Sequence, residues 1–168
     1  MSVRTQAQLR IAQPADAEAI SRLISEALRR TNAADYSSKV IEGMMAAYNV
    51  PRVGLMIRGR EMLVAETGGE IVGTIGYAGG AVRSLFIAPP YQGQGIGQRL
   101  IEAVETLARR SHIRSLTVAA SLTAIGFYRR CGFEMLRPVE PSGVAMMLMH
   151  KWLPEVQDLR LPSGLPNS

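Results

Sequence analysis

Hydrophobic residues return every three or four positions early in the chain. Between Pro14 and Arg30 this spacing predicts an amphipathic helix, with the proline in its first turn and Ile11 at the end of a preceding strand. A second apolar stripe, rich in methionine, predicts another helix over residues 38–48. Methionine at helical spacing is usually core filling, so this stripe indicates packing and not a cofactor site.

The next apolar runs are short and rich in β-branched residues. Strands are expected at residues 62–66, 71–77 and 82–87. The pairs Gly68-Gly69 and Gly79-Gly80 separate them, and turns this small predict antiparallel hairpins. The pattern then becomes helix, strand, helix and strand, at residues 98–110, 116–119, 123–131 and 144–150. This order predicts an α/β fold with a mixed sheet.

Length and composition favour one folded domain. The chain has 168 residues, of which 47% are hydrophobic and 20% charged, and these are ordinary values for a globular protein. We expect one domain over residues 1–153 and a loose tail over 154–168, where prolines and small polar residues gather. Cys131 is the only cysteine, which excludes an internal disulfide. The first ten residues lack a secretory pattern and no apolar stretch is long enough to span a bilayer, so a cytoplasmic location is expected.

The formal net charge is +5, and a polyanionic ligand would account for part of it. A nucleic acid is the competing explanation, but aromatic residues make up only 5% of the chain and no dense run of lysine and arginine occurs. We therefore expect neither a nucleic-acid nor a membrane partner. The arginines that contribute to this charge in the second half include Arg109, Arg110, Arg114, Arg129, Arg130 and Arg137.

A glycine-rich turn joins the strand at residues 82–87 to the helix at 98–110, with the sequence Gln92-Gly93-Gln94-Gly95-Ile96-Gly97. Such a turn directs backbone N–H groups and the positive end of the helix dipole at one point, which suits a phosphate or pyrophosphate. A dinucleotide fingerprint is excluded because Gln98 or Leu100 stands where its last glycine belongs. A Walker A loop is excluded because no lysine follows Gly97.

Two motifs over residues 11–152 resemble the GNAT superfamily of N-acetyltransferases. The first, Leu85-Phe86-Ile87-x-Pro89-x-x-Gln92-x-x-Gly95-x-Gly97, is similar to the acetyl-CoA pyrophosphate motif of that family. The second, Ser121-x-x-Ala124-x-x-Phe127-Tyr128-x-x-x-Gly132-Phe133, is similar to its C-terminal motif. The resemblance implies a mixed central sheet flanked by helices, with an antiparallel N-terminal meander and a splayed parallel centre.

The resemblance also implies where acetyl-CoA binds. The free edge of Leu85, Phe86 and Ile87 would pair with pantetheine almost as an extra strand. Gly95 and Gly97 have no Cβ atoms, which in other residues would hold the backbone away from the pyrophosphate. Ser121, where many family members carry asparagine, is expected to cap the next helix and reach a cofactor oxygen. The residues expected to wrap the pyrophosphate are Gln92, Gly93, Gln94, Gly95, Ile96, Gly97 and Gln98.

By the same resemblance, Tyr128 is the expected catalytic residue and protonates the departing thiolate, while the N–H of Ile87 polarises the thioester carbonyl. Family members often carry a glutamate base at the position of Ala81, and the ribosomal-protein acetylases carry one at that of Leu116; both positions are apolar here. Glu66, Tyr77 and His112 are conceivable bases, but none matches a family position. The sequence therefore assigns no general base, and no metal is expected.

The acceptor would lie between the variable helices near residues 30–50 and the strand edge. Small amines, aminoglycosides, amino acids and peptide N-termini all stay open, and so does a longer acyl donor. A non-catalytic acyl-CoA-binding module is the alternative from another functional class, and a homodimer is a further open question. The polar and aromatic residues of this region are Asn32, Asp35, Tyr36, Glu42 and Tyr48.

Overall fold

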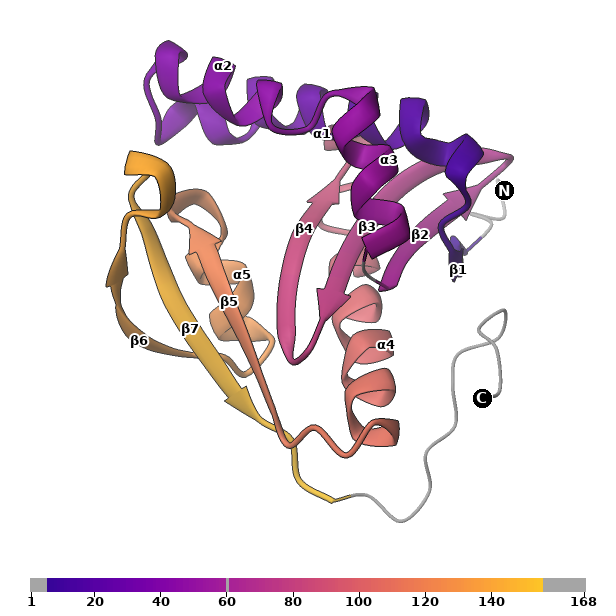
Figure 1. Ribbon diagram of the computed structural model, residues 1–168, viewed down its shortest axis with the longest axis vertical. Coiled ribbons are helices and arrows are strands. Elements are labelled where there is room, and N and C mark those ends of the chain that lie inside the picture. The colour runs from indigo at the N-terminus through magenta and orange to yellow at the C-terminus, as the bar shows by residue number, and fades with distance from the viewer. Residues whose placement is uncertain (1–5, 60, 156–168) are drawn as a thin grey trace.

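The computed structural model describes residues 6–59 and 61–155 (Figure 1). Seven strands form one mixed sheet in the order β1-β2-β3-β4-β5-β7-β6. The strands are β1 (Gln8–Ile11), β2 (Glu61–Thr67), β3 (Glu70–Ala78), β4 (Ala81–Ile87), β5 (Ser115–Ser121), β6 (Glu134–Val139) and β7 (Met146–Trp152). The α-helices are α1 (Ala17–Arg30), α2 (Ser38–Ala46), α3 (Val50–Gly59), α4 (Ile96–Arg110) and α5 (Ile125–Arg130).

The predicted mixed sheet is confirmed. Strands β1 to β4 form an antiparallel meander, β4 and β5 are parallel, and β5, β7 and β6 are again antiparallel. Both predicted glycine pairs make the hairpin turns, and Gly69 and Gly80 have φ values of 79° and 86°. Left-handed backbone of this kind matches the twist of the flanking strands and favours glycine.

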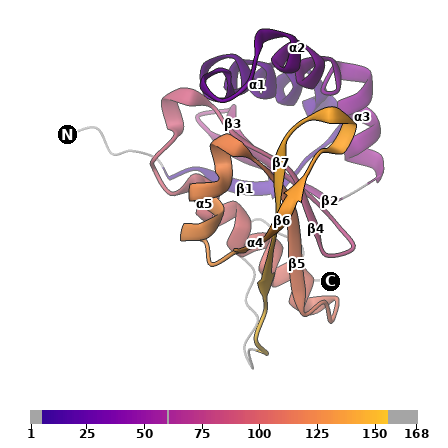
Figure 2. The same cartoon turned by 90° about the vertical axis from the view of Figure 1, so that its left-hand side faces the viewer.

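Helices cover both faces of the sheet, as the alternation along β2 shows. Met62 and Val64 pack into a cluster with α1, α2 and α3, whereas Leu63 and Ala65 pack into a second cluster with α4 and α5. In Figure 2, α4 and α5 lie on one side of the strands and α3 lies on the other. The two faces of the sheet therefore belong to different layers, and a ligand that passes between strands could contact both.

Two elements escape prediction from the sequence pattern. Helix α3 contains Pro51 and Gly54, yet Asn49 caps its start by accepting a hydrogen bond from the N–H of Arg52 at 3.0 Å. Proline is tolerated in a first helical turn, so the sequence Asn-x-Pro was the missed sign of a helix start. Strand β6 lies at the sheet edge with nearly every residue exposed and includes Pro138, so it lacks an alternating pattern.

The predicted tail falls almost wholly outside the described residues, apart from Pro154 and Glu155. Among the helices of the described chain, none combines the length and apolar character needed to cross a membrane.

Candidate active site

The two central parallel strands pair only where they begin. The register joins Ala81 to Thr117 and Val82 to Val118, and no later residue of β4 is paired with β5. Strand β5 instead continues alongside β7, and β4 continues alongside β3, so the two diverge toward α1 and α2 (Figure 1). The splayed centre expected from the motifs is therefore present, and we call the region between the diverging strands the split.

The edge of β4 that faces the split carries backbone groups without a strand partner. The N–H of Ala88 donates to the carbonyl of Val72 at 2.9 Å, on the side of β3. Because backbone groups alternate along an extended strand, the N–H and C=O of Ile87 point the other way, toward β5. The Ile87 carbonyl accepts a hydrogen bond from Gln92 Nε2 at 3.0 Å. The Ile87 N–H is thus directed into the split.

A bulge in β4 marks the point of divergence. Two of its residues, Ser84 and Leu85, lie opposite the single β3 residue Ile75. Ser84 has φ of 54°, a left-handed conformation that residues other than glycine rarely adopt. Backbone strain of this kind concentrates at functional sites, where the surrounding structure holds it in place.

The glycine-rich turn leads into α4 at the open end of the split. Gly95 is the N-cap residue with φ of 82°, and a Cβ atom built on it would meet no other atom within 4 Å. The first hydrogen bond of the helix runs from the Arg99 N–H to the Gly95 carbonyl at 3.1 Å. The preceding N–H groups of residues 96–98 have no partner within the helix and point out of its end. This arrangement can hold an anion.

Gly97 also meets a packing requirement that the sequence did not indicate. A Cβ atom on Gly97 would lie 3.0 Å from two ring carbons of Phe127. Its missing side chain therefore lets α5 pack closely against the first turn of α4. The result is that the glycine turn and the residue next to Tyr128 form one packed unit.

Tyr128 extends from α5 and is 4% exposed. Its ring packs edge-to-face against Phe127 and Phe133, with centroids 5.2 and 5.3 Å away. Burial, with smaller contributions from Cys131 and Tyr48, raises the pKa of the Tyr128 phenol well above its usual range. The phenol is therefore protonated at neutral pH, which is the state that a proton donor requires.

The loop between α1 and α2 connects the two diverging strands. On the side of β4, the hydroxyl of Thr31 accepts a hydrogen bond from Gln92 Nε2 at 3.0 Å. On the side of β5, Asn32 Nδ2 donates to the hydroxyl of Ser121 at 3.3 Å. The expected helix cap by Ser121 is wrong, because its side chain accepts no hydrogen bond from the helix that follows. It faces Asn32 instead.

Tyr36 fixes the same loop to the end of β5. Its hydroxyl accepts from the N–H of Leu122 at 2.8 Å and donates to the carbonyl of Ala145 at 2.7 Å. Beside it, Asp35 accepts a hydrogen bond from the hydroxyl of Thr123 at 2.8 Å. Three of the acceptor-side residues singled out from the sequence, Asn32, Asp35 and Tyr36, thus lie across the open end of the split.

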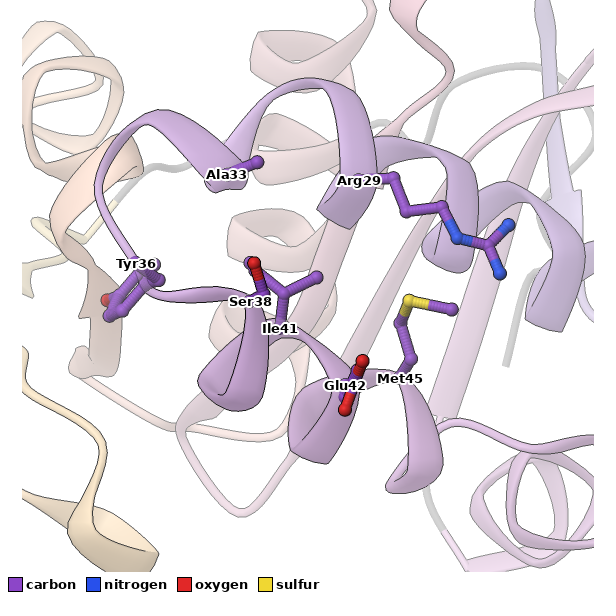
Figure 3. A pocket seen from close by; sticks show the side chains of 7 residues that line it. All are labelled: Arg29, Ala33, Tyr36, Ser38, Ile41, Glu42 and Met45. Atoms are coloured by element: carbon purple, nitrogen blue, oxygen red, sulfur yellow. The ribbon is translucent and has the colours of Figure 1, made fainter.

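Glu42 is not brought to the split. It lies on a hollow of about 360 Å³ between α1 and α2, with Arg29 on the other side and Tyr36 at one end (Figure 3). The remaining residue of this set, Tyr48, points to the bulge, where its hydroxyl accepts from Ser84 Oγ at 3.4 Å. No motif indicated this contact, because it joins residues 36 positions apart.

None of the three conceivable bases lies at the split. Glu66 is on β2 and is bound by Arg10 at 2.7 Å. Tyr77 is buried on the α4 side opposite Val82, where β4 and β5 are still paired. His112 is exposed in the turn after α4, at the end of the helix away from the glycine turn. The described residues also contain no cluster of three or more side chains able to hold a metal ion.

Comparison with known proteins agrees with this geometry. A model for the acetyltransferase (GNAT) domain matches residues 21–153. The chain is 29% identical over 147 residues to N-acetyltransferase 8 of Rattus norvegicus, covering 80% of this chain and 63% of that protein. It is 34% identical over 90 residues to an IAA acetyltransferase of Azospirillum brasilense, covering 48% of this chain and 59% of that protein. The chain thus spans less than two thirds of the length of these curated relatives.

Solved structures show the same fold over most of their length. A GCN5-related N-acetyltransferase from Rhodopseudomonas palustris superposes with a TM-score of 0.83 at 28% identity, covering 91% of this chain and 99% of that one. The PaiA N-acetyltransferase of Thermoplasma acidophilum, solved with coenzyme A, gives a TM-score of 0.75 at 20% identity, covering 88% and 99%. The split sheet, the glycine turn and the matched domain together show that the chain belongs to the GNAT acetyltransferase family.

Proposed function

We propose that this protein is an acetyl-CoA-dependent N-acetyltransferase that moves the acetyl group directly to a primary amine in a ternary complex. One arrangement supports the proposal: the free edge of β4 borders the split, α4 begins at its end, and α5, which carries the buried phenol of Tyr128, packs against the first turn of α4 through Phe127 and Gly97. Two structural relatives support the choice of donor, since PaiA was solved with coenzyme A and YncA of Salmonella typhimurium with acetyl-CoA. The acceptor is a small-molecule or peptide amine.

The donor would lie along the split from the glycine turn inward. Its pyrophosphate would contact the N–H groups of residues 96–98 and the turn from Gln92 to Gly95, where the absent Cβ of Gly95 leaves the approach open. Its pantetheine would pair with the backbone of Leu85 and Ile87, and Ser121 would face it from β5. The thioester then lies between the bulge and Tyr128.

The transfer needs few groups from the protein. The amine nitrogen attacks the thioester carbonyl, and the N–H of Ile87 stabilises the negative charge that forms on its oxygen. The tetrahedral intermediate collapses with loss of the thiolate, which takes a proton from the Tyr128 phenol. Solvent returns that proton to Tyr128, and the nitrogen releases its surplus proton to solvent, so the products are an amide and free CoA.

Initial-rate kinetics test direct transfer. Varying acetyl-CoA at several amine concentrations should give intersecting double-reciprocal lines, and intact-protein mass spectrometry after incubation with acetyl-CoA alone should show no acetylated chain. Parallel lines and an acetylated protein would contradict direct transfer. Tight binding of CoA without turnover of any amine would favour the alternative of a non-catalytic acyl-CoA-binding module. Faster transfer from a longer acyl-CoA than from acetyl-CoA would identify the longer acyl-CoA as the donor.

A further inference from the structure

We infer that the acceptor is a primary amine that also carries a carboxylate, with its nitrogen beside the hydroxyl groups of Tyr48 and Ser84 and its carboxylate on the guanidinium of Arg83. This acceptor subsite rests on the proposed acetyl transfer and adds the chemical class of the substrate.

The bulge turns two consecutive polar side chains to the same face. Val82 and Leu85 pack into the cluster on the α4 side of the sheet. Arg83 and Ser84 lie between them and, because the bulge inserts one residue, both face the opposite layer. The Tyr48 hydroxyl, at 3.4 Å from Ser84 Oγ, confirms this direction for Ser84.

Tyr48 is held firmly at this position. Its carbonyl accepts a hydrogen bond from the Ser21 hydroxyl of α1 at 2.6 Å. Its ring packs edge-to-face on Phe86, with centroids 5.5 Å apart. Tyr48 packs in the cluster with α1, α2 and α3, whereas Tyr128 packs in the cluster with α4 and α5, so the two phenols come from opposite layers. An amine beside Tyr48 would approach the thioester from the side opposite the proton donor.

The charge on this face favours an anionic group. Arg83 is exposed and has no hydrogen-bond or ion-pair partner among residues 6–59 and 61–155. Across the split, Arg137 of β6 pairs with Leu148 of β7, which pairs with Ala119 of β5, so a second arginine lies on the far side of the split. On β6, Glu134 is displaced along the strand and pairs with His150.

A planar guanidinium binds a carboxylate through two parallel hydrogen bonds, so Arg83 is suited to this partner. A polyamine or an aminoglycoside would instead meet repulsion from the Arg83 guanidinium. The hydroxyl oxygens of Tyr48 and Ser84 can accept N–H hydrogen bonds and so direct the nitrogen lone pair at the thioester. In the step itself the N–C bond forms and the C–S bond breaks; one nitrogen proton passes to water and the Tyr128 proton passes to sulfur.

Matched acceptors test this subsite. We would measure acetyl transfer to the twenty amino acids and to their carboxamides, which differ only in the carboxylate, with spermidine and kanamycin as cationic probes. The wild-type protein should prefer an amino acid over its own amide by at least about tenfold in kcat/KM, as expected for one charge-assisted contact. Arg83→Gln should abolish this preference, whereas Arg58→Gln on α3, which removes the same charge elsewhere, should retain it.

Tyr48→Phe keeps the ring and its packing on Phe86 but removes the hydroxyl. It should lower kcat/KM for both members of a pair by about tenfold without changing the Kd for acetyl-CoA measured by calorimetry. A preference for the carboxamides or the cationic probes would overturn the subsite, and so would a preference for amino acids that persists in Arg83→Gln. Either result would leave the proposed acetyl transfer itself intact. If acetyl-CoA binds and no amine in any set is acetylated, the proposed transfer fails, and the subsite with it.

Discussion

Replacement of Tyr128 by phenylalanine removes one oxygen from a buried position on α5. The phenol is 4% exposed, and its hydroxyl has no hydrogen-bond partner among the described residues, so its loss leaves no other group unpaired. We therefore expect the free energy of unfolding to change by less than about 1 kcal/mol. Burial raises the pKa of Tyr128, so the wild-type phenol is protonated up to at least pH ~10, the ordinary value for tyrosine.

The effect on catalysis should be much larger. A positioned general acid contributes about 10²- to 10⁴-fold. We expect the lower end, because a thiol with a pKa of about 8.5 is already a fair leaving group. Tyr128→Phe should thus lower kcat about 100-fold, which corresponds to about 2.7 kcal/mol of transition-state stabilisation.

The assay is continuous detection of free CoA with an amine that the wild-type protein acetylates, together with urea denaturation of both proteins. Tyr77→Phe is the matched control, since Tyr77 is 3% exposed, packs on the same face of the sheet, and has a hydroxyl with no hydrogen-bond partner in the part of the chain that the structure describes. It lies where β4 and β5 are still paired, so it should retain full kcat. Unchanged kcat in Tyr128→Phe, or an equal loss in both variants, would refute the assignment of Tyr128 as proton donor.

Three further changes have defined expectations. Glu105→Gln removes the buried carboxylate that Lys151 contacts at 2.5 Å. It should lower the free energy of unfolding, measured by urea denaturation, by about 2 kcal/mol, which is less than for a fully buried ion pair because Lys151 is partly exposed. A change near zero would contradict a stabilising ion pair. Hydrogen bonds from Arg10 hold the pKa of Asp16 below its usual range, so its contribution is present at neutral pH and lost as the pH falls. The Tm difference between wild type and Asp16→Asn should therefore shrink from pH 7 to about pH 3, and a constant difference would contradict the linkage. Gly97→Ala should lower both Tm and kcat, since its Cβ meets an aromatic ring at 3.0 Å; a higher Tm with full kcat would show that helix propensity outweighs the clash.

Much of the fold could be predicted because local pattern and tertiary structure agree. The stripe from Ile20 to Leu28 and the glycine pairs of the hairpins specify elements that packing then preserves. Strand β6 could not be found, because an exposed edge strand needs no alternation and tolerates Pro138. Helix α3 could not be predicted because it contains Pro51. A proline is tolerated in the first turn of a helix but breaks the helix at a later position, and the sequence alone does not say which applies.

The cofactor side of the candidate site could be predicted better than the acceptor side. The glycine turn and Tyr128 lie in contiguous motifs, and the structure packs the two motifs together where Phe127 meets Gly97. Tyr48 and Ser84 meet only through tertiary packing, and serine gives no sign of a left-handed bulge, which glycine or asparagine would have indicated. The motif identifies Gly97 by its position, but only the structure shows that the ring of Phe127 leaves no room for a side chain there.

Calorimetric titration with acetyl-CoA tests the central claim most directly. The wild-type protein should bind one equivalent, and Gly95→Glu should abolish binding by placing a carboxylate at the anion-binding end of α4. Gly69→Glu is the control for backbone strain, because Gly69 has φ of 79° against 82° for Gly95, and neither has an atom within 4 Å of the added Cβ. Binding retained by Gly69→Glu and lost in Gly95→Glu would support the donor site. No binding by the wild-type chain, or equal binding by all three proteins, would contradict it.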